Sequence, residues 1–177
     1  MAARLHDSLV PIDALMRRIK AGGIPRVPGT AVFMTRTEQD APPVLLWHLK
    51  HNRSLHERLF ILTVVTEPVP WIADSERLAV QEIAPTVWRA RARFGFMERP
   101  DVPILLRRAQ EGGCVIDLSD VTYFVGHETI VAREDKQGLS HWLEEMYAFL
   151  QRNSAHVTEY FRLPADTVVE IGREIAI

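Results

Sequence analysis

The segment RLFILTVVT, residues 58–66, constrains the fold of this chain more than any other part of the sequence. It is nearly all apolar and rich in β-branched side chains, which favours a short strand. A strand without a polar face must be covered on both sides, as in the middle of a sheet flanked by helices. Pro68 and Pro70 follow it and end it, because proline cannot donate to a sheet ladder. The segment therefore predicts a central, doubly covered strand.

Other segments predict further strands and helices by their periodicity and their end signals. The expected strands are 30–35, 78–83, 86–97, two short strands within 122–132 that meet near Gly126, and 167–177. The expected helices are 44–52, 101–111, with Asp101 as its N-terminal cap, and 140 to about 153. Strands and helices intermix along one chain, so we expect an α/β (or α+β) single domain. Its core would be a mixed β-sheet of about five to seven strands flanked by helices.

A short amphipathic helix is expected at residues 11–20, with Ile12, Leu15, Met16 and Ile19 on one side. Its last turn is basic, which suits a linker at an anionic membrane surface. A helix packed on its own domain has the same spacing. The Gly- and Pro-rich stretch 22–29 then divides the chain into a linker helix, residues 1–25, and a globular domain, residues 26–177.

Composition limits the class of protein. Apolar residues make up 47% and charged residues 25%, the balance of a globular domain that is soluble as an isolated chain. A net charge of -2 gives no sign of a nucleic-acid partner, which usually needs a basic face. No apolar run approaches the roughly 20 residues of a membrane span. Cys114 is the single cysteine, so a disulfide within one chain is excluded.

Histidines gather in the segment 48–57, which contains His48, His51, His56 and Glu57. Two histidines three residues apart share a helix face, a spacing that metal coordination can use. The helix is expected to end near Asn52, so His56 would point elsewhere, and no second cluster supplies further ligands. Hydrogen-bonded structural histidines are the favoured interpretation over a metal site. His51 and Asn52 remain candidates for contact with a ligand.

Arg89, Arg91 and Arg93 alternate along the expected strand 86–97 and would line one face of it. Such a positive stripe could hold a phosphate or an acidic partner. The alternative is a solvated sheet face whose arginines pair with glutamates. Neither of the glycine-rich phosphate motifs, GxGxxG or GxxxxGK[ST], occurs in the chain.

Gly126, His127 and Glu128 place a glycine beside two titratable groups at a strand junction. A His-Glu pair can carry out acid-base chemistry. No nucleophile or metal ligand lies nearby in the sequence, so a β-bulge is the favoured interpretation. We therefore predict no catalytic residues, and keep His127 as a candidate ligand contact.

Six sequence blocks together resemble a known family. They are RVPGTAVFMT at 26–35, HNRSLHE at 51–57 with the strand that follows it, FGFMERPDVP at 94–103, TYFVGHE at 122–128, YFRLP at 160–164 and VVEIG at 168–172. In this order, over about residues 15–177, they resemble the C-terminal cytoplasmic domain of KUP/HAK/KT potassium uptake permeases. The chain departs from the family pattern mildly at Phe94, where Tyr is common, and at His127, where Arg is common.

The resemblance implies a non-enzymatic regulatory or structural domain of a potassium:proton symporter, at the cytoplasmic face of the cell membrane. The ion path of the family lies in membrane helices upstream, so potassium would be bound there and this domain would need no cofactor or metal. The implied partners are the membrane domain of the same permease, a second copy in a homodimer, and a cytoplasmic nucleotide.

Two alternatives to this regulatory or structural role stay open. The first is a ligand-sensing, nucleotide-binding module, and the second is an enzyme on the same fold. In the regulatory case, we expect the helix at 11–20 to transmit the state of the domain, because it is the connection to the last membrane span.

Overall fold

The computed structural model describes residues 10–37, 40–131 and 157–176, without the side chains of 127–131 and 173–176. Within these ranges the helices are α1 (Ile12–Lys20), α2 (Pro43–Asn52), α3 (Val102–Glu111) and α5 (Val157–Tyr160), with short 3-10 turns η3 (Asp74–Glu76) and η4 (Ala165–Thr167). The strands are β1 (Arg26–Thr35), β2 (Leu55–Glu67), β3 (Leu78–Ala84), β4 (Val87–Gly95), β5 (Val121–Val131) and β6 (Val168–Ala176).

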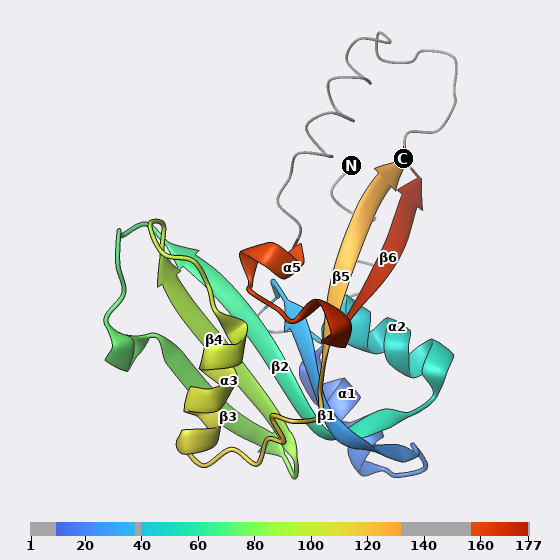
Figure 1. Cartoon of the computed structure of the whole chain (residues 1–177). Helices are drawn as coiled ribbons and strands as arrows, with labels where there is room; N and C mark the ends of the chain where they lie inside the picture. Colours follow the sequence, from blue (N-terminus) through green and yellow to red (C-terminus); the bar gives the residue numbers. More distant parts are fainter. Residues whose placement is uncertain (1–9, 38–39, 132–156, 177) are drawn as a thin grey trace, which may run out of the picture.

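The strands form one sheet in the order β3-β4-β2-β1-β5-β6 (Figure 1). Every neighbouring pair is parallel except β3 and β4, which are antiparallel. Parallel neighbours cannot be joined by a tight turn, so helix α2 lies between β1 and β2 along the chain and strand β3 lies between β2 and β4. The predicted α/β domain with a mixed, helix-flanked sheet is confirmed.

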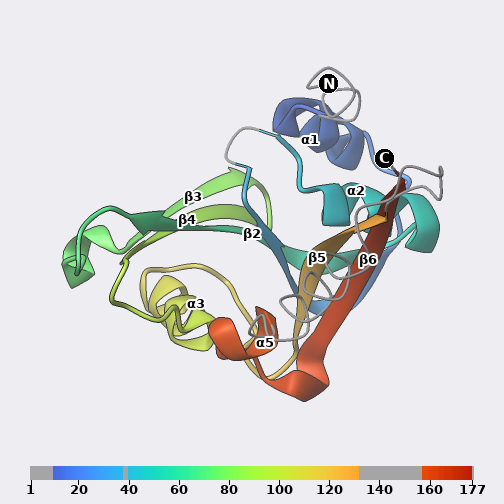
Figure 2. The ribbon, with the colours of Figure 1, turned by 90° about the horizontal axis from the view of Figure 1, so that it is seen from above.

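Helices cover both faces of the sheet, with α1 and α2 on one side and α3 and α5 on the other (Figure 2). Strand β2 sends Leu59 and Ile61 into the core beneath α1 and α2, and Phe60 and Leu62 into the core beneath α3. All four side chains are at most 1% exposed. The predicted central strand, buried on both faces, is confirmed.

Helix α1 packs on the domain through the side that the sequence predicted. Ile12, Leu15, Met16 and Ile19 are each at most 8% exposed and belong to the core beneath α1 and α2. A helix of this length is marginal in water alone. Burial of each such side chain contributes about 1.5–3 kcal/mol, so packing holds the helix together. The sequence allowed either a linker at a membrane surface or a helix packed on its own domain, and in the structure α1 packs on the domain.

The predicted break and β-bulge at Gly126 are wrong. Strand β5 is continuous and pairs with β6 without a register shift from Tyr123↔Val168 to Val131↔Ala176. A Cβ at Gly126 would lie 3.6 Å from Cβ of Val44 in α2. This distance is an ordinary van der Waals contact, so the strand would accommodate a Cβ here, and the glycine marks neither a bulge nor a change of strand direction.

Two further expectations concern the helices. The predicted Asp101 cap is confirmed, since its Oδ1 accepts a hydrogen bond of 3.1 Å from the backbone N–H of Ile104. The helix predicted from Ser140 to about Asn153 lies outside the described residues. None of the helices in the described ranges is long and apolar enough to cross a membrane.

Because β1, β2 and β4 are parallel, their carboxyl ends lie at one edge of the sheet, here called the carboxyl edge. The chain enters α1 at this same edge. The carbonyl of Val10 accepts a hydrogen bond of 2.8 Å from the N–H of Ala41, and Pro11 forms a bridge with Asp40. Residues 40 and 41 follow β1, so the entry to α1 is fixed beside the end of that strand.

Two loops at the carboxyl edge are tied together, one after β2 and one after β4. The N–H groups of Phe96 and Met97 donate to the carbonyls of Val69 and Pro70, at 2.9 and 3.3 Å. Gly95 lies against this junction, and a Cβ there would overlap the backbone of Pro70 and Trp71. The close approach of the two loops therefore requires glycine at position 95.

We expect Gly95→Ala to lower the free energy of unfolding by about 1–3 kcal/mol, the usual cost of forcing extra volume into a packed site. The backbone of Pro70 would have to shift, because no flexible side chain can move aside. Urea unfolding of the 177-residue chain measures the effect. Gly172→Ala is the matched control in β6, where a Cβ meets nothing within 4 Å. Equal free energies for the two variants would contradict the argument.

Candidate functional site

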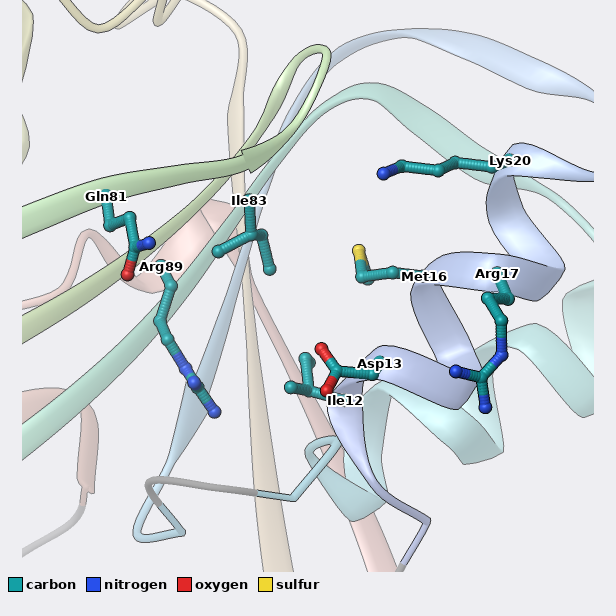
Figure 3. Close-up of a pocket in the computed structure, with 8 residues that line it drawn as sticks. All are labelled: Ile12, Asp13, Met16, Arg17, Lys20, Gln81, Ile83 and Arg89. Atoms are coloured by element: carbon teal, nitrogen blue, oxygen red, sulfur yellow. The ribbon is translucent and has the colours of Figure 1, made fainter.

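A cleft of about 340 Å³ lies between α1 and the outer strands β3 and β4 (Figure 3). Apolar side chains from the helix and from β3 meet across it, and polar side chains from three elements surround them. The lining residues are Ile12, Asp13, Met16, Arg17 and Lys20 of α1, Gln81 and Ile83 of β3, and Arg89 of β4.

The helical repeat explains which side chains of α1 reach the cleft. Asp13, Arg17 and Lys20 stand at positions i, i+4 and i+7, so they lie along one flank beside the buried apolar side. Asp13 lies in the first turn and the two basic residues in the last turn, which suits the helix dipole. One flank of α1 therefore presents polar groups to the sheet.

The charge of the cleft is predominantly positive, with Arg17, Lys20 and Arg89 against Asp13. Arg89 is half-buried, and in the described part of the chain no hydrogen bond or ion pair satisfies its guanidinium. A guanidinium binds carboxylate or phosphate in a bidentate manner. The cleft can therefore hold a ligand that combines an anionic group with an apolar part.

The three arginines of β4 share one face, as predicted, but they have different surroundings. Arg93 Nε donates to Glu67 Oε1 at 2.9 Å, and Arg91 lies 3.9 Å from the same oxygen. The interpretation as a sheet face with Arg-Glu pairs therefore holds for Arg91 and Arg93. Arg89 alone among the three lines the cleft.

The structure brings His48 and His56 together, contrary to the expectation that His56 points elsewhere. Their ring centroids are 6.2 Å apart, and both rings contact Phe124 edge-on, at 4.7 and 5.8 Å. Arg53 adopts the left-handed conformation directly after α2, which turns the chain back into β2. That turn carries His56 beneath the helix that holds His48.

His48 is 4% exposed, and its Nδ1 accepts a hydrogen bond of 2.8 Å from the amide nitrogen of Asn52. Two buried ring nitrogens, Nε2 of His48 and Nδ1 of His56, have no hydrogen-bond partner among the residues that the structure describes. Desolvation lowers the pKa of both histidines, with the neighbouring charge of His56 adding to the effect on His48. Asp120 opposes the shift at His56 by raising its pKa. Both rings are therefore most stable uncharged.

His48 and His51 lie three residues apart on α2, but their surroundings differ. His51 is exposed and lies against Trp47, with ring centroids 4.4 Å apart and ring planes tilted by 33°, whereas His48 is buried. The boundary between the inner and outer sides of α2 passes between them. Across the described residues, no group of three or more His, Cys, Asp or Glu side chains could hold a metal ion.

The remaining candidates are placed as follows. Asn52 is exposed, and its amide nitrogen donates the hydrogen bond to His48. Glu57 is exposed on β2. His127 pairs with Gly172 across β5 and β6, and its side chain lies outside the described residues. The role of His51, Asn52 and His127 as ligand contacts stays a prediction.

Sequence reasoning missed the contribution of α1 to the site. It found Arg89 but not its neighbours Arg17 and Lys20, which lie far from it in the sequence. The basic last turn was noted as a feature of a membrane linker. Nothing in a single sequence indicates which strand a helix packs against.

Fold and cleft together describe an α/β domain with a basic cleft beside a mixed sheet. Residues 28–177 match the family model for the K+ potassium transporter C-terminal domain. The chain therefore belongs to the family of potassium transporter C-terminal domains. No solved structure matches the chain.

Individual relatives agree with the family assignment. The chain is 55% identical over 177 residues to the "Probable potassium transport system protein Kup 1" of Bradyrhizobium sp. (strain ORS 278). It is 41% identical to the protein of the same name from Geobacter sulfurreducens, and 38% identical to "Probable potassium transport system protein Kup 3" of Legionella pneumophila (strain Lens). Each match covers 100% of the chain and 28% of the relative. The chain thus spans little more than a quarter of these proteins.

We expect the stability of the domain to fall as the pH drops below about 6.5, the pKa of an unfolded histidine. The folded pKa values of His48 and His56 are depressed, so the unfolded state binds protons more readily. Their contribution is fully present above pH 6.5 and is lost as the pH falls through the folded values. Urea unfolding at pH 7.5 and pH 5 measures the loss.

The double variant His48→Gln/His56→Gln should lose less stability over this interval than the parent chain. The carboxyls of Glu98 and Asp74 have ordinary pKa values of 4.5 and 3.8, and the fold lowers both. Their effect on stability therefore falls below the pH interval of this experiment. A parent and a variant with the same loss between pH 7.5 and pH 5 would rule out these histidines as the cause.

Proposed function

We propose that this chain is the cytoplasmic regulatory and structural domain of a potassium:proton symporter whose ion path lies in the remainder of the permease. The observation that carries the proposal is the match to the potassium transporter C-terminal domain over residues 28–177. Relatives named as potassium transport system proteins are more than three times as long as the chain, which covers 28% of each. The other part of the permease is therefore the first partner that we propose.

Regulation requires that a change in the domain reach the membrane part. A domain shifts the equilibrium of a transporter only if it interacts differently with two states of it. Helix α1 is suited to this task, because it is packed on the sheet through four buried side chains and fixed at its start by the Val10–Ala41 hydrogen bond. A force on the segment before α1 would therefore act on the sheet.

An immunoblot of fractionated source cells tests the main proposal. An antibody against this domain should detect a band several times larger than 20.2 kDa in the membrane fraction. In sealed vesicles, protease should remove the epitope only when the cytoplasmic side faces outward. A band near 20.2 kDa in the cytosol would reject the proposal.

We expect Leu15→Ala in the full-length permease to change potassium uptake, because it loosens α1 from the sheet. Leu15 is 2% exposed, and such a substitution in a core costs about 2–5 kcal/mol. Uptake is measured in cells that lack other potassium transporters, at matched protein levels. Arg18→Ala, at an exposed position of the same helix, is the control. Unchanged uptake in Leu15→Ala, and with residues 12–20 replaced by a Gly-Ser linker, would refute coupling through α1.

The cleft favours a second candidate function, a ligand-sensing module for an anionic small molecule such as a nucleotide. The supporting observation is Arg89, half-buried and without a partner among the described residues, opposite the basic flank of α1. A ligand that bridges Arg89 and α1 would strengthen the contact that we propose for signal transmission. The two functions are therefore compatible.

A thermal-shift screen with nucleotides should give saturable stabilisation of the chain if it senses such a ligand. We expect Arg89→Gln to weaken the apparent affinity about tenfold or more, because it removes a charge-assisted contact. Arg107→Gln, at an exposed position of α3 on the other face of the sheet, is the control. No stabilisation by any nucleotide, or equal affinities in the two variants, would remove this candidate.

We also propose that the domain has no catalytic role and needs no cofactor, with potassium bound in the membrane part. Self-association beneath the membrane stays part of the proposal. The support is the family itself, whose members in the comparisons are named for potassium transport.

A further inference from the structure

An exposed apolar surface lies on the two joined loops at the carboxyl edge. Four large exposed apolar side chains lie in these joined loops and are here called the apolar platform: Val69, Trp71, Phe96 and Met97. Trp71 is 64% exposed, Phe96 61% and Met97 60%. Tryptophan, phenylalanine and methionine are the residues enriched where proteins bind one another.

The platform is held rigidly, which distinguishes it from a loose apolar loop. Below it, Arg77 and Glu98 form an ion pair of 2.6 Å whose side chains are 14% and 10% exposed. Oε2 of Glu98 also accepts hydrogen bonds from the N–H groups of Gly95 and Ile72, at 2.6 and 3.1 Å. Arg77 in turn donates to the carbonyl of Ile72 at 2.8 Å. A surface fixed in this way is preorganised for binding.

Most of the charges around the platform are paired within the domain. Arg77 pairs with Asp74 as well as Glu98, Arg108 pairs with Asp74, and Arg93 pairs with Glu67 and Glu76. Residues 68–73 carry no charge. An anionic membrane surface is held by clusters of basic residues, and Arg99, exposed beside Glu98, makes no such cluster. The chemistry therefore favours an apolar protein surface over a lipid headgroup layer.

The position of the platform indicates which protein supplies that surface. The platform follows the carboxyl ends of β2 and β4, and the entry to α1 lies beside the carboxyl end of β1. Strands β1 and β4 are separated by β2. β1 ends at Thr35, whereas β4 continues four residues further, to Gly95. At normal strand dimensions the two ends therefore lie roughly 16 Å apart, at the same end of the sheet. The family model describes a C-terminal domain, so the rest of each relative precedes it. That preceding part therefore approaches the domain at the platform's own edge.

We propose that the apolar platform docks on an apolar protein surface of the preceding, membrane part of the same permease. The proposal rests on the function proposed above. Docking at the platform would give the domain a second attachment besides the covalent one through α1. Two attachments fix the orientation of the domain, whereas α1 alone would leave it free to turn.

The test uses the full-length permease in its native membrane, with the photoreactive residue p-benzoylphenylalanine placed at Trp71. We expect illumination to give a cross-link within the same polypeptide, to residues that precede the domain, identified by mass spectrometry. The control carries the probe at Val115, which is 59% exposed and follows α3 at the opposite edge of the sheet. The yield at position 71 should exceed the control about tenfold or more.

A second probe separates docking from mere proximity. With the photoreactive residue at Met97, the variant Phe96→Ser should reduce the cross-link at least about fivefold, because it removes an aromatic contact of the kind that dominates interfaces. Phe96 is mostly exposed, so the fold should tolerate the change, and thermal unfolding of the domain checks this.

Other products of the reaction would overturn the proposal. Cross-links to phospholipid would assign the platform to the membrane surface, and cross-links between two copies would assign it to a dimer. A membrane-bound permease without any cross-link at position 71 would refute docking but leave the proposed function intact. A free chain near 20.2 kDa in the cytosol would refute both.

Discussion

The pairing of β2 with two parallel neighbours, β1 and β4, is the constraint on which the rest of the structure depends. Leu59 to Leu62 send alternate side chains into two separate cores, so both faces of this strand must be covered. Parallel strands cannot be joined by tight turns, so α2 connects β1 to β2, and the edge strand β3 runs back within the sheet between β2 and β4. The same pairing brings the carboxyl ends of β1, β2 and β4 to one edge, where the loops with the platform and the entry to α1 lie.

The parts of the fold that could be predicted are those in which one local signal has one structural meaning. The unbroken apolar run of β2, the apolar side of α1 and the Asp101 cap belong to this group, and the structure agrees with each. Gly126 was interpreted as a bulge between two strands, but β5 continues through it. Its continuity follows from the pairing with β6, which is distant in the sequence and which the local pattern does not contain.

The candidate site shows the same division more sharply. Alternation placed Arg89, Arg91 and Arg93 on one face, but their roles depend on distant residues. Glu67 balances the charges of Arg91 and Arg93. Arg89 instead lines the cleft together with two basic side chains of α1, Arg17 and Lys20. His56 lies close to His48 because one left-handed residue, Arg53, reverses the chain between them. Such a turn is not evident from composition, since arginine rarely adopts that conformation.

For the functions proposed above, the layout of the domain would make regulation and attachment physically dependent on one another. The cleft and the platform both involve the half of the sheet formed by β2, β3 and β4, and the cleft has α1 as its other wall. A ligand in the cleft would stabilise one position of α1 against the sheet, while docking at the platform would stabilise one position of the sheet against the membrane part. If both contacts are present, α1 is the element that must accommodate any mismatch between them. Linkage then requires that each binding event change the affinity of the other by the same factor. A domain that senses a ligand and a domain that orients itself beneath a transporter are therefore two descriptions of one coupled equilibrium.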